Sequence, residues 1–309
     1  MKGNEGAYAA SRIDRRVRRA PWDGERSEVS DSQQAGRELV GDFAGADDLL
    51  WAAETGRLER LGAVRVARSG RIGPLVEILM ARRANPVQFA GIALLARFAV
   101  TVEAALARGE IFGDEFRARV GAFPLRRYDA EGDGRDQWSL WSSRAEQAAM
   151  TSGFAKPVAA GIIGAMGELQ DNVFRHSRRP ETGLVAYASM AGTFEIVVAD
   201  AGVGVLASLR ECADYAQLQD AGAALKVAVE DGNSRFGRAS GNGFGMGQMF
   251  RALANHDGEL RFRSDDHALA VRGHSPSLQA HVELGHKARL GGMAISVLCR
   301  APDSGSRGR

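Results

Sequence analysis

The sequence predicts an α+β protein, with a two-layer α/β sandwich in the C-terminal half and, before it, a smaller domain that is mainly helical or mixed α/β. Three observations support this prediction. The length of 309 residues corresponds to two domains, at roughly 100–200 residues per domain. The hydrophobic content of 45% is ordinary for a protein with a packed core. In the C-terminal half, helical and strand patterns are interspersed, which is typical of helices packed on one sheet.

Two tails and two domains are expected along the chain. Residues 1–35 hold five arginines between positions 12 and 19 and few large apolar residues, so they cannot bury enough surface to offset the entropy of ordering. We expect a disordered tail there, with a basic arm that contacts nucleic acid or a partner as the alternative. Residues 36–142 form the expected N-terminal domain, 143–301 the C-terminal domain, and 302–309 a second tail.

The N-terminal domain contains three predicted elements and no motif that carries chemistry. A short strand is plausible over Ala63–Val66, and helical spacing predicts one helix over Gly73–Arg83 and another over Val87–Arg108, separated by Pro86. The polar stretch Tyr128–Gln137 is interpreted as a linker. Its alternating acids resemble a calcium loop, but the glutamate at the twelfth position is missing, so we expect no calcium site.

The C-terminal domain shows a regular succession of elements. An apolar stripe predicts a first helix over Lys156–His176, and glycines follow two later helical patterns as suitable C-terminal caps. The elements expected after that helix are, in order, strands at Leu184–Met190 and Phe194–Ala199, helices at Gln217–Glu230 and Gly245–His256, and strands at Glu259–Arg263 and Met293–Cys299.

The first of three chemically informative clusters lies on the first of these helices. Glu168 and Asn172 are four residues apart and therefore share one helix face, with Gly161 and Gly164 near it. Asparagine can hold a divalent metal through its carbonyl oxygen, and glutamate can accept a proton from water or a hydroxyl. A solvated helix face is the alternative interpretation of this pair.

The second cluster is Asp200-Ala-Gly202-Val-Gly204, directly after an apolar strand. A carboxylate at a strand end can accept a hydrogen bond from an exocyclic amine such as that of adenine, and the glycines let a ring or phosphate approach the backbone. A dinucleotide-binding fingerprint fits less well, because the second strand with its terminal acid about 20 residues on is missing. A plain glycine turn is the other alternative.

The third cluster places four glycines, Gly241, Gly243, Gly245 and Gly247, at the start of a predicted amphipathic helix. A loop that opens a helix with unpaired N–H groups is an anion site suited to phosphates. A flexible linker is the alternative interpretation. The sequence has no Walker lysine motif, which excludes a P-loop.

In this order, ExxxN, DxGxG and GxGxG are similar to the N, G1 and G2 boxes of the GHKL family (gyrase, heat-shock chaperone, histidine kinase, MutL), over roughly residues 145–300. The resemblance implies the Bergerat fold with bound ATP and Mg²⁺. Asn172 would hold Mg²⁺, Asp200 would accept from the adenine amine, and Val205–Ser240 would be a mobile lid. The glycines would line the nucleotide, with Gly202 and Gly204 beside adenine and ribose, and Gly241, Gly243, Gly245 and Gly247 around the phosphates.

Glu168 separates the branches of that superfamily. Sensor histidine kinases usually carry a non-acidic residue there and a phosphoacceptor histidine upstream, whereas no histidine precedes His176 in this chain. The run from Glu168 through Asn172 to His176-Ser177 resembles the anti-sigma-factor serine kinases, in which the glutamate activates a protein serine hydroxyl. The resemblance therefore implies a cytoplasmic serine/threonine kinase-like regulator of a small partner protein, with Glu168 as general base.

Two other functions stay open on the sequence. One is an ATP-gated interaction module with little or no catalysis, whose lid closes on the nucleotide. The other is a DNA-directed ATPase that uses the arginine-rich tail. The N-terminal domain has no identified role, and a homodimer stays open because homodimers are common in the superfamily.

The composition of the chain argues against several other partners and sites. The net charge of +2 gives no global drive toward nucleic acid or an anionic membrane, and no apolar run approaches the ~18–20 residues of a membrane span. Cys212 and Cys299 lie outside any CxxC pattern, so we expect neither a disulfide framework nor a zinc site, and a reducing compartment is the default. The histidines after residue 255 have irregular spacings, which argues against zinc there as well.

Overall fold

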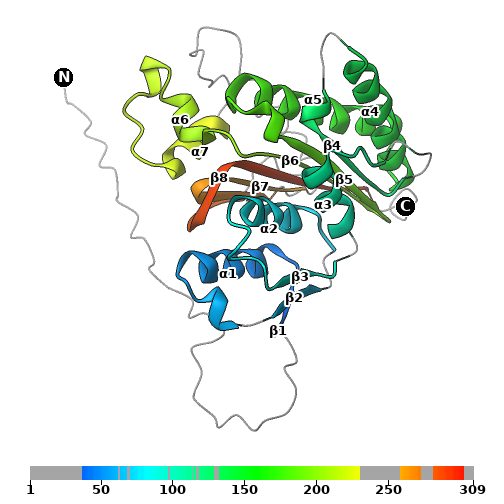
Figure 1. The fold of residues 1–309 in the computed structure, drawn as a ribbon. Coiled ribbons are helices and arrows are strands. Elements are labelled where there is room, and N and C mark those ends of the chain that lie inside the picture. Colours follow the sequence, from blue (N-terminus) through cyan, green and yellow to red (C-terminus); the bar gives the residue numbers. More distant parts are fainter. Residues whose placement is uncertain are drawn as a thin grey trace, which may run out of the picture. The chain divides into compact units, whose positions relative to one another are not determined.

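Two β-sheets organise the chain, a three-stranded parallel sheet in its N-terminal part and a five-stranded antiparallel sheet in the remainder (Figure 1). The computed structural model describes residues 37–302 except 62, 68–69, 97, 114, 116–117, 129–131, 230–257 and 273–280. The protein is therefore α+β, as the sequence predicted. Among the described residues, no helix is long and apolar enough to cross a membrane.

The three-stranded sheet has the order β1-β2-β3, and helices connect its strands. Its elements are, in chain order, β1 (Arg37–Val40), α1 (Phe43–Glu54), η1 (Leu58–Leu61), β2 (Val64–Ala67), α2 (Gly73–Ala84) and β3 (Ile92–Leu94). Crossovers between parallel neighbours are right-handed, so two successive crossovers in one direction put both helices on the same face of the sheet. Val64 and Val66 of β2 are buried in one core with the apolar residues of α1 and α2.

Two predictions in this region are confirmed and one is partly wrong. The predicted strand at Ala63–Val66 is β2, and the predicted helix at Gly73–Arg83 is α2. The predicted helix over Val87–Arg108 contains a turn and the strand β3 before α3 begins at Ala99 and runs to Arg108. Periodicity alone does not distinguish a short apolar strand from a helix, and here pairing with β2 decides for the strand.

The five-stranded sheet has the order β4-β5-β6-β8-β7. Its strands and the elements between them are β4 (Val120–Pro124), η2 (Leu125–Arg127), α4 (Gly134–Thr151), α5 (Lys156–His176), η3 (Pro180–Thr182), β5 (Leu184–Met190), β6 (Thr193–Asp200), α6 (Gly204–Leu209), η4 (Ala213–Tyr215), α7 (Ala221–Val229), β7 (Glu259–Arg272) and β8 (His281–Arg300). The four predicted strands are confirmed, and β7 and β8 are longer than predicted. Helix α4 begins at Gly134, inside the stretch interpreted as a linker.

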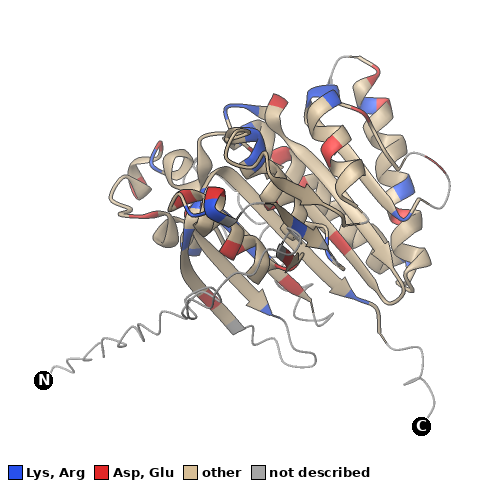
Figure 2. Cartoon of the chain, turned by 60° about the horizontal axis from the view of Figure 1, so that its bottom comes forward, with Lys and Arg blue, Asp and Glu red and all other residues tan. Residues whose placement is uncertain are grey.

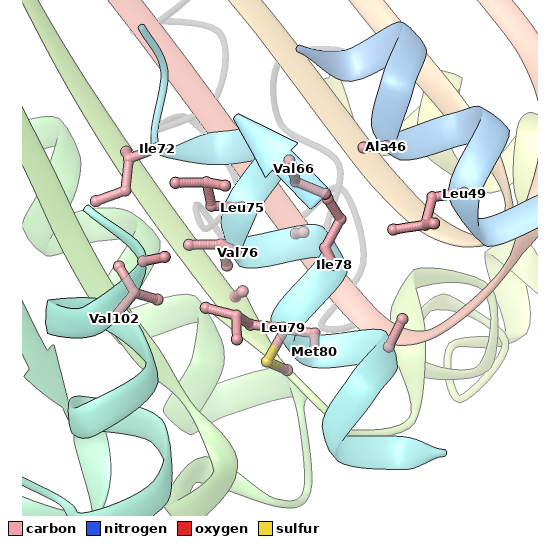
Figure 3. Close-up of a cluster of buried hydrophobic side chains, with 14 of the residues drawn as sticks. Ala46, Leu49, Val66, Ile72, Leu75, Val76, Ile78, Leu79, Met80 and Val102 are labelled. Carbon is pink, nitrogen blue, oxygen red and sulfur yellow. The ribbon is translucent and has the colours of Figure 1, made fainter. Parts of the chain in front are cut away.

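Helices cover both faces of the five-stranded sheet, because its strands alternate apolar residues between two cores. Phe194, Ile196 and Val198 of β6 belong to a core with α4 and α5. Val197 and Ala199 belong to the other core, with α1, α2 and α3. Figure 3 shows the part of that second core contributed by α2, and Figure 1 shows α2 against the sheet.

Helices α4 and α5 thus cover one face of the sheet, and α1, α2 and α3 cover the other face, so the sheet lies between two layers of helices. The sheet also takes β4 from before residue 142, where the sequence places a domain boundary.

A buried cluster of charges joins α1 and α2 to the sheet. Arg261 of β7 contacts Asp47 of α1 at 2.5 Å and Glu77 of α2 at 2.7 Å. Arg263, which is 0% exposed, contacts Glu77 at 2.8 Å and Asp47 at 3.1 Å. Burial opposes ionisation of Asp47, yet Arg261 and Lys287 hold its pKa below the ordinary value. Asp47 is therefore held as an anion among cations of the β7–β8 hairpin, and Glu77 contacts the same two arginines.

A second polar contact fixes the start of α2. The fully buried Glu195 of β6 accepts the backbone N–H of Ile72 at 2.7 Å and that of Gly73 at 3.2 Å. Arg71 and the Ser296 hydroxyl also donate to this carboxylate, at 3.2 and 2.6 Å. The first N–H groups of a helix lack partners within the helix and carry partial positive charge. A carboxylate of the sheet satisfies them here, so α2 is docked on β6 by its N-terminus.

We expect Glu77→Gln to lower the free energy of unfolding by roughly 3–5 kcal/mol, because it leaves two buried guanidinium groups with one anion fewer. Urea unfolding of the full chain measures this loss. Glu103→Gln is the matched control, because Glu103 forms an exposed ion pair with Arg82 and such pairs contribute about 0–1 kcal/mol. Equal urea midpoints for the two variants would contradict the prediction.

Candidate functional site

The first cluster lies on α5, as predicted. The apolar residues of α5, among them Met166 and Val173, are buried in the core with the sheet, whereas Glu168 is exposed and Asn172 is half-buried. Within the described residues, neither polar side chain has a hydrogen bond or an ion pair. A Cβ atom at Gly161 or Gly164 would meet no atom within 4 Å. This face of α5 therefore offers an acid and an amide beside open space.

Asp200 is the last residue of β6, and its carboxylate is buried without a cationic partner among the described residues. Asp200 is 2% exposed, and among the described residues its carboxylate accepts one hydrogen bond, from the backbone N–H of Gly202 at 2.7 Å from Oδ1. Burial raises the pKa of Asp200 to about 6, and the Gly202 hydrogen bond opposes that rise only in part. A carboxylate with spare acceptor capacity in a buried position can receive a hydrogen bond from a ligand.

Three backbone N–H groups anchor the loop that follows Asp200. Ala201 donates to Oγ1 of Thr182 at 3.0 Å, which ties the loop to η3. Val203 donates to the carbonyl oxygen of Ser177 at 3.0 Å, just beyond the end of α5. Val205 donates to Oγ of Ser264 on β7, also at 3.0 Å. The loop is therefore held by three separate elements rather than by its own turn alone.

Two glycines allow this close packing. A Cβ atom at Gly202 would lie 2.1 Å from the carbonyl oxygen of Ser177. At Gly292, where φ is +78°, a Cβ atom would lie 2.0 Å from the carbonyl oxygen of Asp200. Gly202 belongs to the predicted motif, whereas sequence reasoning missed Gly292, Thr182 and Ser264. The pair Gly291-Gly292 before a predicted strand was the available signal, because consecutive glycines mark close backbone approach.

The contact between Ser177 and Val203 brings the first and second clusters together. At a rise of about 1.5 Å per residue, Asn172 lies about 7.5 Å and Glu168 about 13.5 Å along the axis of α5 from Ser177. The third cluster (Gly241, Gly243, Gly245 and Gly247) and the predicted helix over Gly245–His256 lie outside the described residues. The structure therefore describes two of the three clusters, and these two adjoin.

Part of the predicted lid over Val205–Ser240 is described. It folds into α6, η4 and α7, and α7 packs against β7. The predicted helix over Gln217–Glu230 is α7, which begins at Ala221. Residues 230–240 lie outside the described part. His176, at the end of α5, contacts the Ser208 hydroxyl of α6 at 3.2 Å, so the start of the lid region is attached to the helix that carries Glu168 and Asn172.

No group of three or more His, Cys, Asp or Glu side chains within the described ranges is placed to hold a metal ion. His267 and His286 are near each other on the β7–β8 hairpin, and Nδ1 of His267 lies 2.8 Å from Asp266. Cys212 and Cys299 are both free thiols. Asn172 as a Mg²⁺ ligand stays a prediction.

We expect Gly202→Ala to lower the free energy of unfolding by about 1–3 kcal/mol or more, because its methyl group would overlap the Ser177 carbonyl. The control is Gly164→Ala, which lies in the exposed part of α5 with open space around it. That change should raise stability by up to about 1 kcal/mol, because alanine is the better helix former. Thermal unfolding of both variants would test the contrast, and a stable Gly202→Ala variant would contradict it.

We expect Asp200→Asn to stabilise the protein at neutral pH. The ordinary pKa of 3.8 rises to about 6 on folding, so the folded state binds the proton more tightly than the unfolded state does. Stability attributable to this group is therefore present below pH ~4 and is lost as pH rises through about 6. The change should recover roughly 3 kcal/mol at pH 7 and little at pH 4. Urea unfolding at both pH values measures this, and equal effects at both would contradict it.

Comparisons with known proteins add little to this geometry. No protein-family model matches the chain. No curated protein matches it either. Among solved structures, the B subunit of the DNA gyrase from Myxococcus xanthus is similar at 13% identity, with a TM-score of 0.26. The similarity covers 48% of this chain and 38% of the gyrase chain. At this TM-score, the likeness supports no inference about activity.

Proposed function

We propose that residues 143–301 bind ATP with Mg²⁺ and act as a serine/threonine kinase-like regulator of a small protein partner. The observation that carries the proposal is the buried carboxylate of Asp200. Burial of an ionised carboxylate with an unfilled acceptor position is costly, and an amine donor from a ligand would offset that cost. The adenine amine is such a donor, whereas a guanine ring would present an oxygen acceptor at the same place.

The surroundings of Asp200 suit a planar base. The loop from Ala201 to Val205 uses its own N–H groups on Thr182, Ser177 and Ser264, so it is held in place before any ligand binds. A fixed loop loses little entropy on binding, which favours affinity. Gly202 and Gly204 are proposed to lie beside the adenine and ribose, and Gly241, Gly243, Gly245 and Gly247 are proposed to hold the phosphates through backbone N–H groups.

The proposed metal ligand and the proposed general base both lie on α5. Asn172 is the proposed Mg²⁺ ligand through its amide oxygen, and the ion supplies neutralisation of phosphate charge when bound. Glu168 is the proposed general base that takes the proton from an incoming serine or threonine hydroxyl. Its exposed position on α5 supports this role, because a protein substrate must reach the base from solvent.

An ATP-gated interaction module is the second candidate, and one observation favours it. The β7–β8 hairpin contacts α7 on one side and carries the cations that bind Asp47 and Glu77 of α1 and α2 on the other. A movement of α6 and α7 on nucleotide binding would reach the N-terminal helices through this hairpin. The DNA-directed ATPase relies on the arginine-rich tail over residues 1–35, which lies outside the described residues. Over the described elements, Figure 2 shows cationic and anionic residues interspersed.

The test is calorimetry with ATP and with GTP in the presence of Mg²⁺, together with transfer of labelled γ-phosphate. We expect ATP binding to the wild type, weaker GTP binding, and at least about a tenfold loss for Asp200→Asn, because the amide presents its NH₂ group to the adenine amine. Affinity should also fall below about pH 6, as the carboxylate is protonated. Glu168→Gln should keep ATP binding and lose transfer.

The outcomes separate the two candidates. Binding without label on protein or in free phosphate, when tested with the partner, would favour the interaction module. No ATP binding by the wild type would overturn both. Gln147→Ala is a suitable control, because Gln147 is exposed on α4, a helix that carries none of the proposed site residues. Its affinity for ATP should equal that of the wild type.

A further inference from the structure

Three arginines form a cluster at the C-terminal end of α3, which packs against β4 at one edge of the five-stranded sheet (Figure 1). Nη1 of Arg83 and Nη2 of Arg126 both donate to the carbonyl oxygen of Leu106, at 3.1 and 3.4 Å. Nε of Arg127 donates to the carbonyl oxygen of Gly109 at 2.8 Å. All three arginines are exposed, and the first two are neighbours because they share one acceptor atom. Arg83, Arg126 and Arg127 are the arginine cluster.

Capping of α3 accounts for only part of the arginine cluster. The last carbonyl groups of a helix lack partners within the helix and carry partial negative charge, so one cation at this end is favourable. Gly109 ends α3 in the left-handed region, with φ of +72°, and a Cβ atom on it would lie 2.4 Å from Nε of Arg126. A larger residue there would displace that guanidinium group. Further cations at the same helix end repel the first, so a helix cap alone does not require three.

The acids beside the arginine cluster are paired with other arginines. Glu103 of α3 pairs with Arg82 at 3.3 Å, and Glu110 pairs with Arg108. Within the part of the chain that the structure describes, no carboxylate forms an ion pair with a member of the arginine cluster. The two pairs are neutral and the cluster adds three cations, so these seven side chains carry three uncompensated positive charges.

The guanidinium groups of the cluster are held in place and have donors to spare. A guanidinium group has five N–H donors in a planar fork that fits a carboxylate with two parallel hydrogen bonds. The hydrogen bonds to the helix end use one nitrogen atom of each arginine. Because backbone carbonyls already hold these side chains, less entropy is lost when an anion binds them. The cluster is therefore suited to binding carboxylates from outside the described chain.

The arginine cluster lies at the end of the sheet that carries the candidate site. Pro124, the last residue of β4, pairs with Leu184 of β5, which pairs with Ala199 of β6, directly before Asp200. Strands β4 and β6 are two strand spacings apart, about 10 Å. The helical turn η2, which includes two members of the cluster, follows β4 and packs against η3. Thr182 of η3 in turn anchors the loop after Asp200.

We propose that the arginine cluster binds an acidic segment, rich in aspartate and glutamate, of the protein partner. The inference rests on the proposed function for the existence of that partner, whereas binding of an acidic segment requires no nucleotide. A segment held at η2 would keep the rest of the partner beside the Asp200 loop. A nucleic acid is less well matched, because it requires positive charge along an extended stripe. Over the described elements, cations and anions are instead interspersed (Figure 2).

Fluorescence anisotropy of a labelled octa-aspartate peptide, titrated with the full chain in the absence of nucleotide, is the first measurement. We expect saturable binding that weakens as salt is added. Arg126→Gln should raise the dissociation constant at least about tenfold, because it replaces charge-assisted hydrogen bonds by neutral ones. Arg83→Gln should do the same. Each variant leaves the other arginine on the Leu106 carbonyl, so α3 keeps a cap in both.

Arg272→Gln is the matched control, because it removes the same charge from an exposed position. Arg272 ends β7, which is the edge strand opposite β4 in the five-stranded sheet. Its dissociation constant should equal that of the wild type. Arg126→Lys keeps the charge but lacks the planar fork, so its affinity should fall between those of the wild type and Arg126→Gln. The circular dichroism spectrum and unfolding midpoint of each variant check that the fold is retained.

Three results would overturn the proposal. The first is a wild type that does not bind octa-aspartate, or folded variants Arg83→Gln and Arg126→Gln that bind it as tightly as the wild type. The second is an equal loss in Arg272→Gln, which would make the binding a general charge effect. The third is tighter binding of octathymidylate than of octa-aspartate at the same arginines, which would make a nucleic acid the ligand.

Calorimetry with ATP on the same samples separates this proposal from the proposed function. A chain that binds ATP but not the peptide would overturn the docking surface alone. A chain that binds the peptide through Arg83 and Arg126 but does not bind ATP would support the docking surface and overturn the nucleotide site.

Discussion

The fold depends on a layer of buried charge between the N-terminal helices and the antiparallel sheet. Arg261 and Arg263 of one strand contact Asp47 and Glu77 from two different helices, and Glu195 of another strand caps the start of α2. Breaking a buried pair on one side leaves an uncompensated charge, which costs far more than an exposed pair contributes. These contacts have strict geometry, so they specify the position of α1 and α2 on the sheet, whereas apolar packing alone would tolerate sliding.

The β7–β8 hairpin supports both the candidate site and the N-terminal helices. The loop after Asp200 is anchored beside the end of α5, whereas its first residue, Ala201, packs against the core that contains α1 and α2. The β7–β8 hairpin belongs to both sides, because Ser264 anchors the loop while Arg261 and Arg263 hold the N-terminal helices. The candidate site and the N-terminal part of the chain thus share one structural support, which a simple tether between two domains would not provide.

Asp200 differs from the carboxylates of the charge layer, because its burial does not stabilise the fold at neutral pH. The charge layer pairs its carboxylates with arginines, but Asp200 is buried with one backbone donor and a raised pKa. The fold gains nothing from that carboxylate at neutral pH, and the three anchors of the following loop hold it in place nonetheless. Groups kept in such a state at the end of a strand are typical of binding sites, where a ligand supplies the missing partner.

The sequence by itself determined the local features whose physics is contained within a few residues. Helical periodicity predicted α2 and α5, apolar runs predicted β5 and β6, and the motif after β6 identified Asp200 and its glycines. The tertiary structure alone decided that Ile92–Leu94 is a strand, that β4 joins the sheet, and that Gly292, Thr182 and Ser264 support the Asp200 loop. It also decided that Glu77 and Arg263 meet across 186 positions of the chain. Strand pairing and buried ion pairs join residues far apart in sequence, so no local pattern encodes them, and only the packed chain reveals which partners satisfy one another.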